Sequence, residues 1–246
     1  MRLLKLAPPY RVHLLDYGQR FEQYIIPGSL GPLQSPDERE PDALKWLANY
    51  DIATSPEYAR HPFSSHIYIR DEFIHRYGFS IPSKEAIIAI HGFAPQGIID
   101  FGCGNGYWSF VLQQNGLTAI PIDLMPPKTG RNHYWKSKHF GATPLPPKFK
   151  RHWTKIQTGD TSSIQFYGKP EMALFISWPP MSDMAYRALK AYSGNKFIYI
   201  GEGETGCTAD DDFFELLSNE WRQVDTLASI PSFNCIHDCL EFYVRI

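Results

Sequence analysis

From residue 97 onward, short apolar runs alternate with segments of helical periodicity. The apolar runs, which end at Gly, Pro, Asn or Asp, predict strands at 97–101, 118–122, 153–157, 172–177 and 196–200. The segments between and after them predict helices at 107–114, 184–192 and 210–219, the last with Thr208 or Ala209 near its N-cap. Because strands and helices alternate, we expect a parallel, doubly wound sheet of the Rossmann-like type.

The two ends of the chain depart from this alternation. Strands predicted at 222–227 and 240–245 follow each other without a helix, which indicates an antiparallel C-terminal edge. The N-terminal part is rich in proline and aromatics and holds three short helix candidates, at 42–50, 71–77 and 83–90. The pattern therefore predicts two parts: a helical extension or lid over residues 1–94, and an α/β domain over residues 95–246.

Composition narrows the class of protein. The 246 residues carry a net charge of −2, so binding to nucleic acid requires a local basic patch. No apolar run approaches the ~20 residues that span a bilayer. The four cysteines are scattered, unlike those of a disulfide scaffold. We expect a soluble, cytoplasmic protein that is not in the membrane.

The most informative motif is the turn after the strand at 97–101. It carries glycines at 102, 104 and 106, and Asp100 lies two residues before the first of them. A dinucleotide-binding G-x-G-x-x-G turn requires a third glycine at the position of Tyr107, so a nicotinamide dehydrogenase is disfavoured. No G-x-x-x-x-G-K-[ST] phosphate loop is present either.

The spacing Asp100-x-Gly102-x-Gly104-x-Gly106 resembles motif I of the class I methyltransferases that use S-adenosylmethionine (SAM). The resemblance covers about residues 97–246, and it implies that SAM is the cofactor. Asp100 would then organise the amino-acid end of SAM, and the glycine backbone would contact its methionine part. The segment Ser-Trp-Pro-Pro at 177–180 and the loop at 201–208 together also resemble an uncharacterised methyltransferase-like family. This second resemblance implies no particular substrate.

Two further acids follow the next two predicted strands. Asp123 ends the second strand, where an acid accepts hydrogen bonds from ribose hydroxyls. Asp160 follows the third strand, and the resemblance implies that it meets the adenine amino group; a turn or helix N-cap is the alternative for this residue. The predicted cofactor-binding residues are Asp100, Phe101, Gly102, Cys103, Gly104, Tyr107, Asp123, Leu124, Gly159, Asp160, Thr161 and Ser177.

The fourth strand runs into Ser177-Trp178-Pro179-Pro180, which borders the transferred methyl group in class I enzymes. The segment resembles in part the D/N/S-P-P-Y/F/W motif of N-methyltransferases, but here the aromatic precedes the prolines. Methylation of a nucleobase or amide therefore does not follow from it, and a rigid turn with Trp178 as packing is the alternative. Glu202 is a candidate general base if the nucleophile must lose a proton, although its glycine-rich loop also reads as flexible.

The segment 124–157 holds eight basic residues and no Asp or Glu, interleaved with aromatics. Such a segment can bind RNA, a nucleotide or another anion. We favour a solvated insertion, because the rest of the chain offers no matching patch. Within it, Tyr134 lies near enough to Asp123 in sequence to approach the cofactor or substrate. The predicted catalytic residues are Ser177, Trp178, Pro179, Tyr134 and Glu202.

The segment Cys235-Ile236-His237-Asp238-Cys239 has spacing that a metal site can use, but no second ligand pair is evident, so a structural turn is favoured over zinc. The leading hypothesis is a SAM-dependent methyltransferase of unknown acceptor that acts by in-line displacement. The alternative is an inactive SAM-binding or regulatory module on the same fold, with RNA or nucleotide binding through 124–157.

Overall fold

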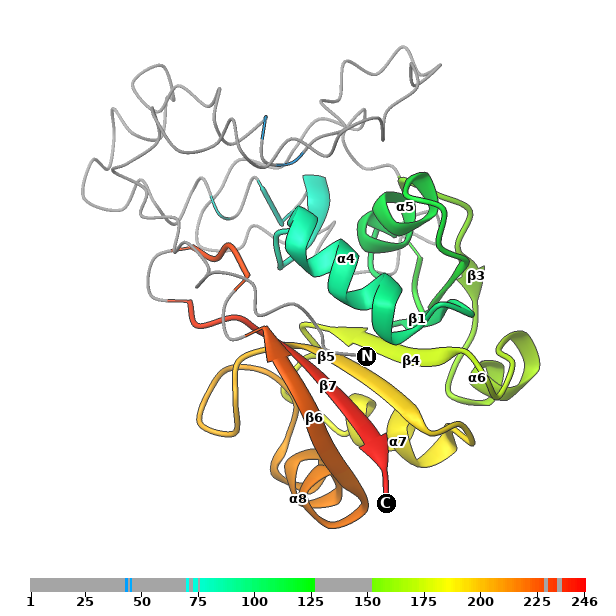
Figure 1. The fold of residues 1–246 in the computed structure, drawn as a ribbon, viewed down its shortest axis with the longest axis vertical. Coiled ribbons are helices and arrows are strands. Elements are labelled where there is room, and N and C mark those ends of the chain that lie inside the picture. Colours follow the sequence, from blue (N-terminus) through cyan, green and yellow to red (C-terminus); the bar gives the residue numbers. More distant parts are fainter. Residues whose placement is uncertain are drawn as a thin grey trace.

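The computed structural model describes residues 43, 45, 70, 73, 74, 76–126, 152–227, 230–233 and 236–246. Nearly all of the helix predicted at 42–50 lies outside these residues, as do Tyr134 and most of the basic segment 124–157. The described part is built on a seven-stranded sheet with the order β3-β2-β1-β4-β5-β7-β6. Figure 1 shows helices on both faces of this sheet.

The strands are β1 (Ile98–Phe101), β2 (Ala119–Asp123), β3 (Gln157–Thr158), β4 (Ala173–Ser177), β5 (Lys196–Gly201), β6 (Trp221–Leu227) and β7 (Cys239–Arg245). β1 is parallel to both β2 and β4, and β2–β3 and β4–β5 are parallel pairs. β7 is antiparallel to both β5 and β6. The predicted fold class, a doubly wound and mostly parallel sheet with an antiparallel C-terminal edge, is therefore confirmed.

Helices cover the two faces because successive strand residues point in opposite directions. Ile98 packs in a core with α4 (Lys84–Phe93) and α5 (Tyr107–Gln114). Its neighbour Ile99 packs in a second core with α6 (Ser162–Tyr167), α7 (Met184–Ala191) and α8 (Asp211–Glu220). All four residues of β1 are buried, as expected for a central parallel strand.

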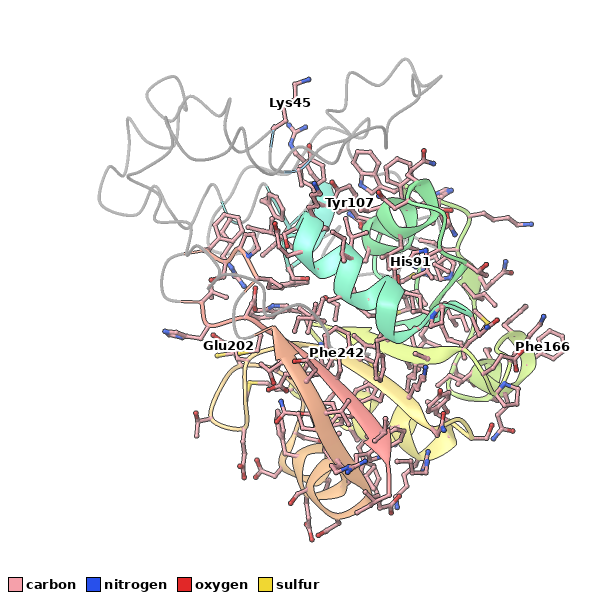
Figure 2. All side chains as sticks on the ribbon, viewed as in Figure 1. Lys45, His91, Tyr107, Phe166, Glu202 and Phe242 are labelled. Carbon is pink, nitrogen blue, oxygen red and sulfur yellow. The ribbon has the colours of Figure 1, made fainter. Side chains whose placement is uncertain are left out.

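α4 covers the helix predicted at 83–90, and Ser83 is its N-cap. The Ser83 side chain accepts a hydrogen bond from Ala86 N at 3.1 Å. The helix extends to Phe93, whose ring lies 5.0 Å from that of Phe242 on β7. Figure 2 shows Phe242 beneath α4, so this helix packs directly on the sheet. The domain boundary at residue 94 stays a prediction.

Three local predictions differ from the structure. β3 has two residues rather than the predicted 153–157, and Trp153 instead packs against Tyr107, with ring centroids 5.1 Å apart. The sequence pattern missed α6, which has a single buried residue, Ile164, and hence little periodicity. The N-cap of α8 is Asp210, whose side chain accepts a hydrogen bond from Phe213 N, rather than Thr208 or Ala209.

None of the described helices is long and apolar enough to cross a membrane.

Candidate functional site

The strand order reverses between β1 and β4, because the chain leaves β1 toward β2 and β3 and later returns to β4 on the other side. Ligands of doubly wound sheets bind beyond the carboxyl ends of strands at such a point. A cavity of about 500 Å³ lies there, between the glycine turn and the segment that follows β4. Its volume falls in the range of about 300–1,000 Å³ that small-molecule sites occupy.

The glycine turn uses a backbone conformation that other residues adopt only with strain. Gly102, Gly104 and Gly106 have φ angles of 73°, 59° and 76°, all in the left-handed region. A Cβ on Gly102 would lie 2.8 Å from the Met184 Cε, whereas a Cβ on Gly104 would meet no atom within 4 Å. The turn therefore exposes bare backbone to the cavity at Gly104.

Asp100 lies behind the turn with only 2% of its surface exposed. Its Oδ2 accepts a hydrogen bond from Ser109 Oγ at 2.6 Å. Burial raises the pKa of Asp100 to about 7, although the Ser109 hydrogen bond opposes the rise. Burial, followed by the charges of Asp100 and Asp123, also raises the pKa of the Cys103 thiol. A positive charge in the cavity would favour the ionised form of Asp100.

Asp123 links the end of β2 to the glycine turn. Its Oδ2 accepts a hydrogen bond from Gly104 N at 2.9 Å, and its Oδ1 accepts one from Met125 N at 2.7 Å. Burial raises the pKa of Asp123, and the two backbone hydrogen bonds act against it. Each carboxylate oxygen has a second lone pair, so Asp123 can still accept hydrogen bonds from a ligand.

Asp160 and Thr161 also line the cavity, beyond the end of β3. Asp160 is exposed, and its Oδ1 accepts hydrogen bonds from both the backbone N and the Oγ of Ser162 at the start of α6. These hydrogen bonds lower the pKa of Asp160. The turn interpretation and the ligand interpretation are compatible, because Asp160 forms the turn and faces the cavity. Gly159 does not line the cavity, and its N donates to Asp123 O at 3.0 Å.

The end of β4 forms the opposite side of the cavity. Ser177 Oγ lies 2.8 Å from Ser80 Oγ. Trp178, which has a φ of 51°, donates from Nε1 to Asp238 Oδ1 at 2.5 Å. Burial raises the pKa of Asp238 to about 7. Both Ser177 and Trp178 line the cavity, whereas Pro179 does not.

Glu202 is not brought to the cavity. It is 7% exposed, and its two carboxylate oxygens accept hydrogen bonds from Cys207 N at 2.9 Å and His237 N at 3.1 Å. These contacts join the loop after β5 to the segment before β7, so the carboxylate holds two loops together. Its position does not favour the general-base role. Tyr134 lies outside the described residues.

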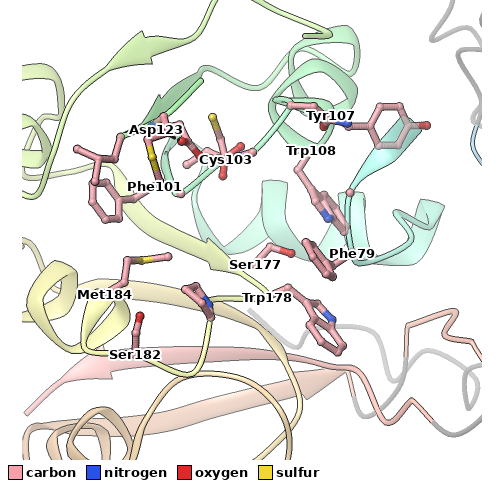
Figure 3. Close-up of a pocket in the computed structure, with 18 of the residues that line it drawn as sticks. Phe79, Phe101, Cys103, Tyr107, Trp108, Asp123, Ser177, Trp178, Ser182 and Met184 are labelled. Atoms are coloured by element: carbon pink, nitrogen blue, oxygen red, sulfur yellow. Dashed lines mark hydrogen bonds between the residues drawn. The ribbon is translucent and has the colours of Figure 1, made fainter. Parts of the chain in front are cut away.

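Twelve of the predicted site residues line one cavity: Asp100, Phe101, Gly102, Cys103, Gly104, Tyr107, Asp123, Leu124, Asp160, Thr161, Ser177 and Trp178. Figure 3 shows Phe101, Asp123 and Met184 toward one end and Phe79, Trp108 and Trp178 toward the other. Among the described residues, no group of three or more His, Cys, Asp or Glu side chains could hold a metal ion. Cys235 lies outside this part of the chain.

Sequence reasoning missed the wall that comes from the N-terminal flank. Four residues of this flank line the cavity, although α4 and β1 separate them from the glycine turn along the chain. They are Ile74, Tyr77, Gly78 and Phe79. Two hydrogen bonds hold the flank against the glycine turn and Trp153. The backbone carbonyl of Arg76 accepts them from Asn105 Nδ2 at 2.8 Å and Trp153 Nε1 at 2.6 Å. The aromatic content of the flank was the only signal for these contacts.

Comparison with solved structures finds methyltransferases, at low identity. Magnesium protoporphyrin IX methyltransferase from Synechocystis PCC 6803, with bound SAM, is 15% identical, with 65% of this chain and 74% of that chain covered and a TM-score of 0.42. A TehB-like SAM-dependent methyltransferase from Corynebacterium glutamicum is 16% identical, with 65% and 87% covered and a TM-score of 0.41. No family model and no curated protein matches the chain.

Proposed function

We propose that this chain is a SAM-dependent methyltransferase that holds SAM in the cavity at the carboxyl ends of β1, β2 and β4. One observation carries the proposal: Asp100, Asp123 and Asp160, from the ends of three consecutive strands, line the same cavity as the left-handed glycine turn. A dinucleotide has two negatively charged phosphates, which three acids in the same cavity would repel. SAM has no phosphate and carries an ammonium and a sulfonium, for which the acids are favourable.

The residues present fit this cofactor. The open space over Gly104 lets a ligand approach the backbone closely. Asp123 is held by two backbone N–H groups and keeps lone pairs for the ribose hydroxyls. Ionised Asp100 would attract the amino-acid end of SAM, and Asp160, which lines the cavity, would accept a hydrogen bond from the adenine amino group. We therefore assign the methionine half to the glycine turn and the adenosine half to Asp123 and Asp160.

When bound, SAM supplies a methyl group on a positively charged sulfur, which an acceptor lone pair displaces in line. Such a reaction depends mainly on alignment and on exclusion of water. We assign the alignment to Ser177 and Trp178, at the end of β4, and a supporting role to Pro179, whose carbonyl accepts a hydrogen bond from Ala209 N at 3.2 Å. Because Glu202 is engaged by Cys207 N and His237 N, the proposed mechanism does not require it as a base.

Isothermal titration calorimetry with SAM and S-adenosylhomocysteine (SAH) tests the cofactor. Asp123→Ala is expected to weaken both affinities by about tenfold or more, because two hydrogen bonds to ribose are lost. Asp212→Ala is the matched control, since Asp212 is exposed on α8 and does not line the cavity. Folded protein that binds neither ligand at about millimolar concentration contradicts the proposal.

Transfer of label from methyl-labelled SAM to a cell extract then separates an enzyme from a module that only binds SAM. A labelled product that is reduced in Asp123→Ala and unchanged in Asp212→Ala supports the methyltransferase. SAM binding without any labelled product in the extract favours the regulatory module instead.

A further inference from the structure

Three aromatic rings gather at the end of the cavity away from Asp123. Phe79 comes from the N-terminal flank, Trp108 from α5, and Trp178 from the turn after β4, and all three line the cavity. Figure 3 shows them together, next to Ser177. We call Phe79, Trp108 and Trp178 the aromatic wall. Because Ser177 ends β4, the wall borders the side of the cavity to which the proposed function assigns the acceptor.

The polar atoms of the wall are used within the protein. Trp108 Nε1 donates to Ser80 Oγ at 2.8 Å, and Trp178 Nε1 donates to Asp238 Oδ1 at 2.5 Å. Ser80 Oγ also lies 2.8 Å from Ser177 Oγ, so the hydroxyl of Ser177 shares the same network. The wall therefore offers the cavity aromatic carbon, with its N–H groups already paired.

The rings of the wall are also held in place before any ligand arrives. Phe79 and Trp178 are stacked, with centroids 5.5 Å apart and an interplanar angle of 15°. The guanidinium of Arg70, which is not among the lining residues, lies 5.1 Å from the centroid of the Trp178 ring. Asp238, which accepts the hydrogen bond from Trp178, is 2% exposed, and the backbone N of the neighbouring His237 donates a hydrogen bond to Glu202. Segments from four parts of the chain thus fix one apolar surface.

We propose that the aromatic wall binds the methyl acceptor and selects a flat ring system with an apolar face, an inference that rests on the proposed function. A flat ring gains both buried apolar area and favourable ring contacts against such a surface. A nucleobase riboside would instead bring hydrogen-bonding groups to a surface whose own donors are occupied, and burying them unpaired is unfavourable. The wall thus argues for an aromatic small molecule over a nucleoside.

The experiment uses the full chain saturated with SAH and titrated with quinoline, a neutral two-ring aromatic, or with cytidine. The readout is the set of six ¹⁵N–H indole signals, one for each tryptophan, with those of Trp108 and Trp178 assigned from Phe substitutions. We expect quinoline to shift the Trp108 and Trp178 signals and to bind about tenfold more tightly than cytidine. The Trp221 signal serves as reference, because Trp221 is buried away from the cavity.

Phe79→Ala is expected to weaken quinoline binding by about tenfold, because it removes one ring of the wall. Phe166→Ala is the matched control, since Phe166 is 79% exposed on α6 and should leave the affinity unchanged. The wild-type shifts do not depend on the Phe79→Ala variant, so poor folding of Phe79→Ala does not remove the test.

Equal or tighter binding of cytidine overturns the inference, as does quinoline binding that moves Trp221 rather than Trp108 and Trp178. Failure of SAH to bind, measured separately by calorimetry, overturns the proposed function instead. In that case the quinoline titration is read on the free protein, where the same shifts still identify the wall as a site for flat apolar rings.

Discussion

At the scale of single residues, the site depends on Asp100, whose carboxyl is buried behind the glycine turn. Its pKa of about 7 reflects desolvation, which a bound cation would partly offset. SAM should therefore bind the ionised form, and below the pKa the site must first lose a proton. The affinity for SAM is expected to rise from about pH 5.5 to about pH 7.5, with proton release on binding.

Calorimetry in buffers of different ionisation enthalpy measures that proton release directly. Asp100→Asn cannot ionise, so its SAM affinity should be weaker and should lose the part of the pH dependence that comes from this residue. Asp123 also has a raised pKa, so some dependence is expected to persist in the variant. A wild-type affinity that does not change with pH would contradict the assignment of Asp100 to the charged end of SAM.

Gly104 gives a second prediction at this scale. Alanine at its φ of 59° costs about 1 kcal/mol of folding free energy, and the added methyl would enter the open space over the turn. Gly104→Ala should stay folded and lose SAM affinity by about tenfold or more. Gly203→Ala is the control, because a Cβ there also meets nothing within 4 Å but Gly203 has no positive φ. Urea unfolding and calorimetry measure the two effects; full SAM affinity in Gly104→Ala would argue against a ligand on the turn.

At the scale of elements, helices and strands with clear start and stop signals were predicted correctly, and weakly patterned ones were not. α5 spans the predicted residues 107–114, because the glycine turn precedes it and Asn115-Gly116 follow its end. β3 is short, because only Ile122 and Asp123 of β2 pair with it. Trp153, predicted as part of that strand, instead packs in an aromatic cluster with Tyr107 and Phe110. No local sequence pattern reveals this cluster, because Trp153 is distant in sequence from the other two residues.

At the scale of the whole molecule, the N-terminal part contributes to both core and site. The buried face of α4 lies in the same core as Ile98 and Phe242. Ser80 bridges Trp108 and Ser177, and Tyr107 Oη accepts a hydrogen bond from Ala43 N at 2.9 Å. The described residues before residue 95 therefore belong to the core and form part of the cavity wall.

A pair of shortened chains tests this prediction. A chain of residues 95–246 would expose the apolar face that α4 covers, so it should unfold at a clearly lower urea concentration than a chain of residues 70–246. Both should be compared with the full chain by circular dichroism and intrinsic fluorescence. Equal urea midpoints for the two shortened chains would contradict this prediction. They would mean that residues 95–246 reach their full stability without α4, as the predicted domain boundary at residue 94 implies.

From the sequence alone follow the fold class and the end of the cavity that holds the three acids. Alternation of apolar strands and helices allows few architectures, and in a parallel sheet residues at consecutive strand ends must meet at one edge. Asp100, Asp123 and Asp160 could therefore be placed together without coordinates. The left-handed glycines were predictable for a related reason, because a local steric requirement leaves its mark on the residue type.

Tertiary structure decided the rest. Three contacts depend on how segments distant in sequence pack. Phe79 stacks on Trp178, Asp238 accepts a hydrogen bond from the Trp178 indole, and Glu202 accepts hydrogen bonds from backbone N–H groups. Such contacts have no periodicity and no fixed spacing, since they arise from burial of whichever side chains meet. The aromatic end of the cavity is built from these contacts, which is why a cofactor could be proposed from the sequence and an acceptor class only from the structure.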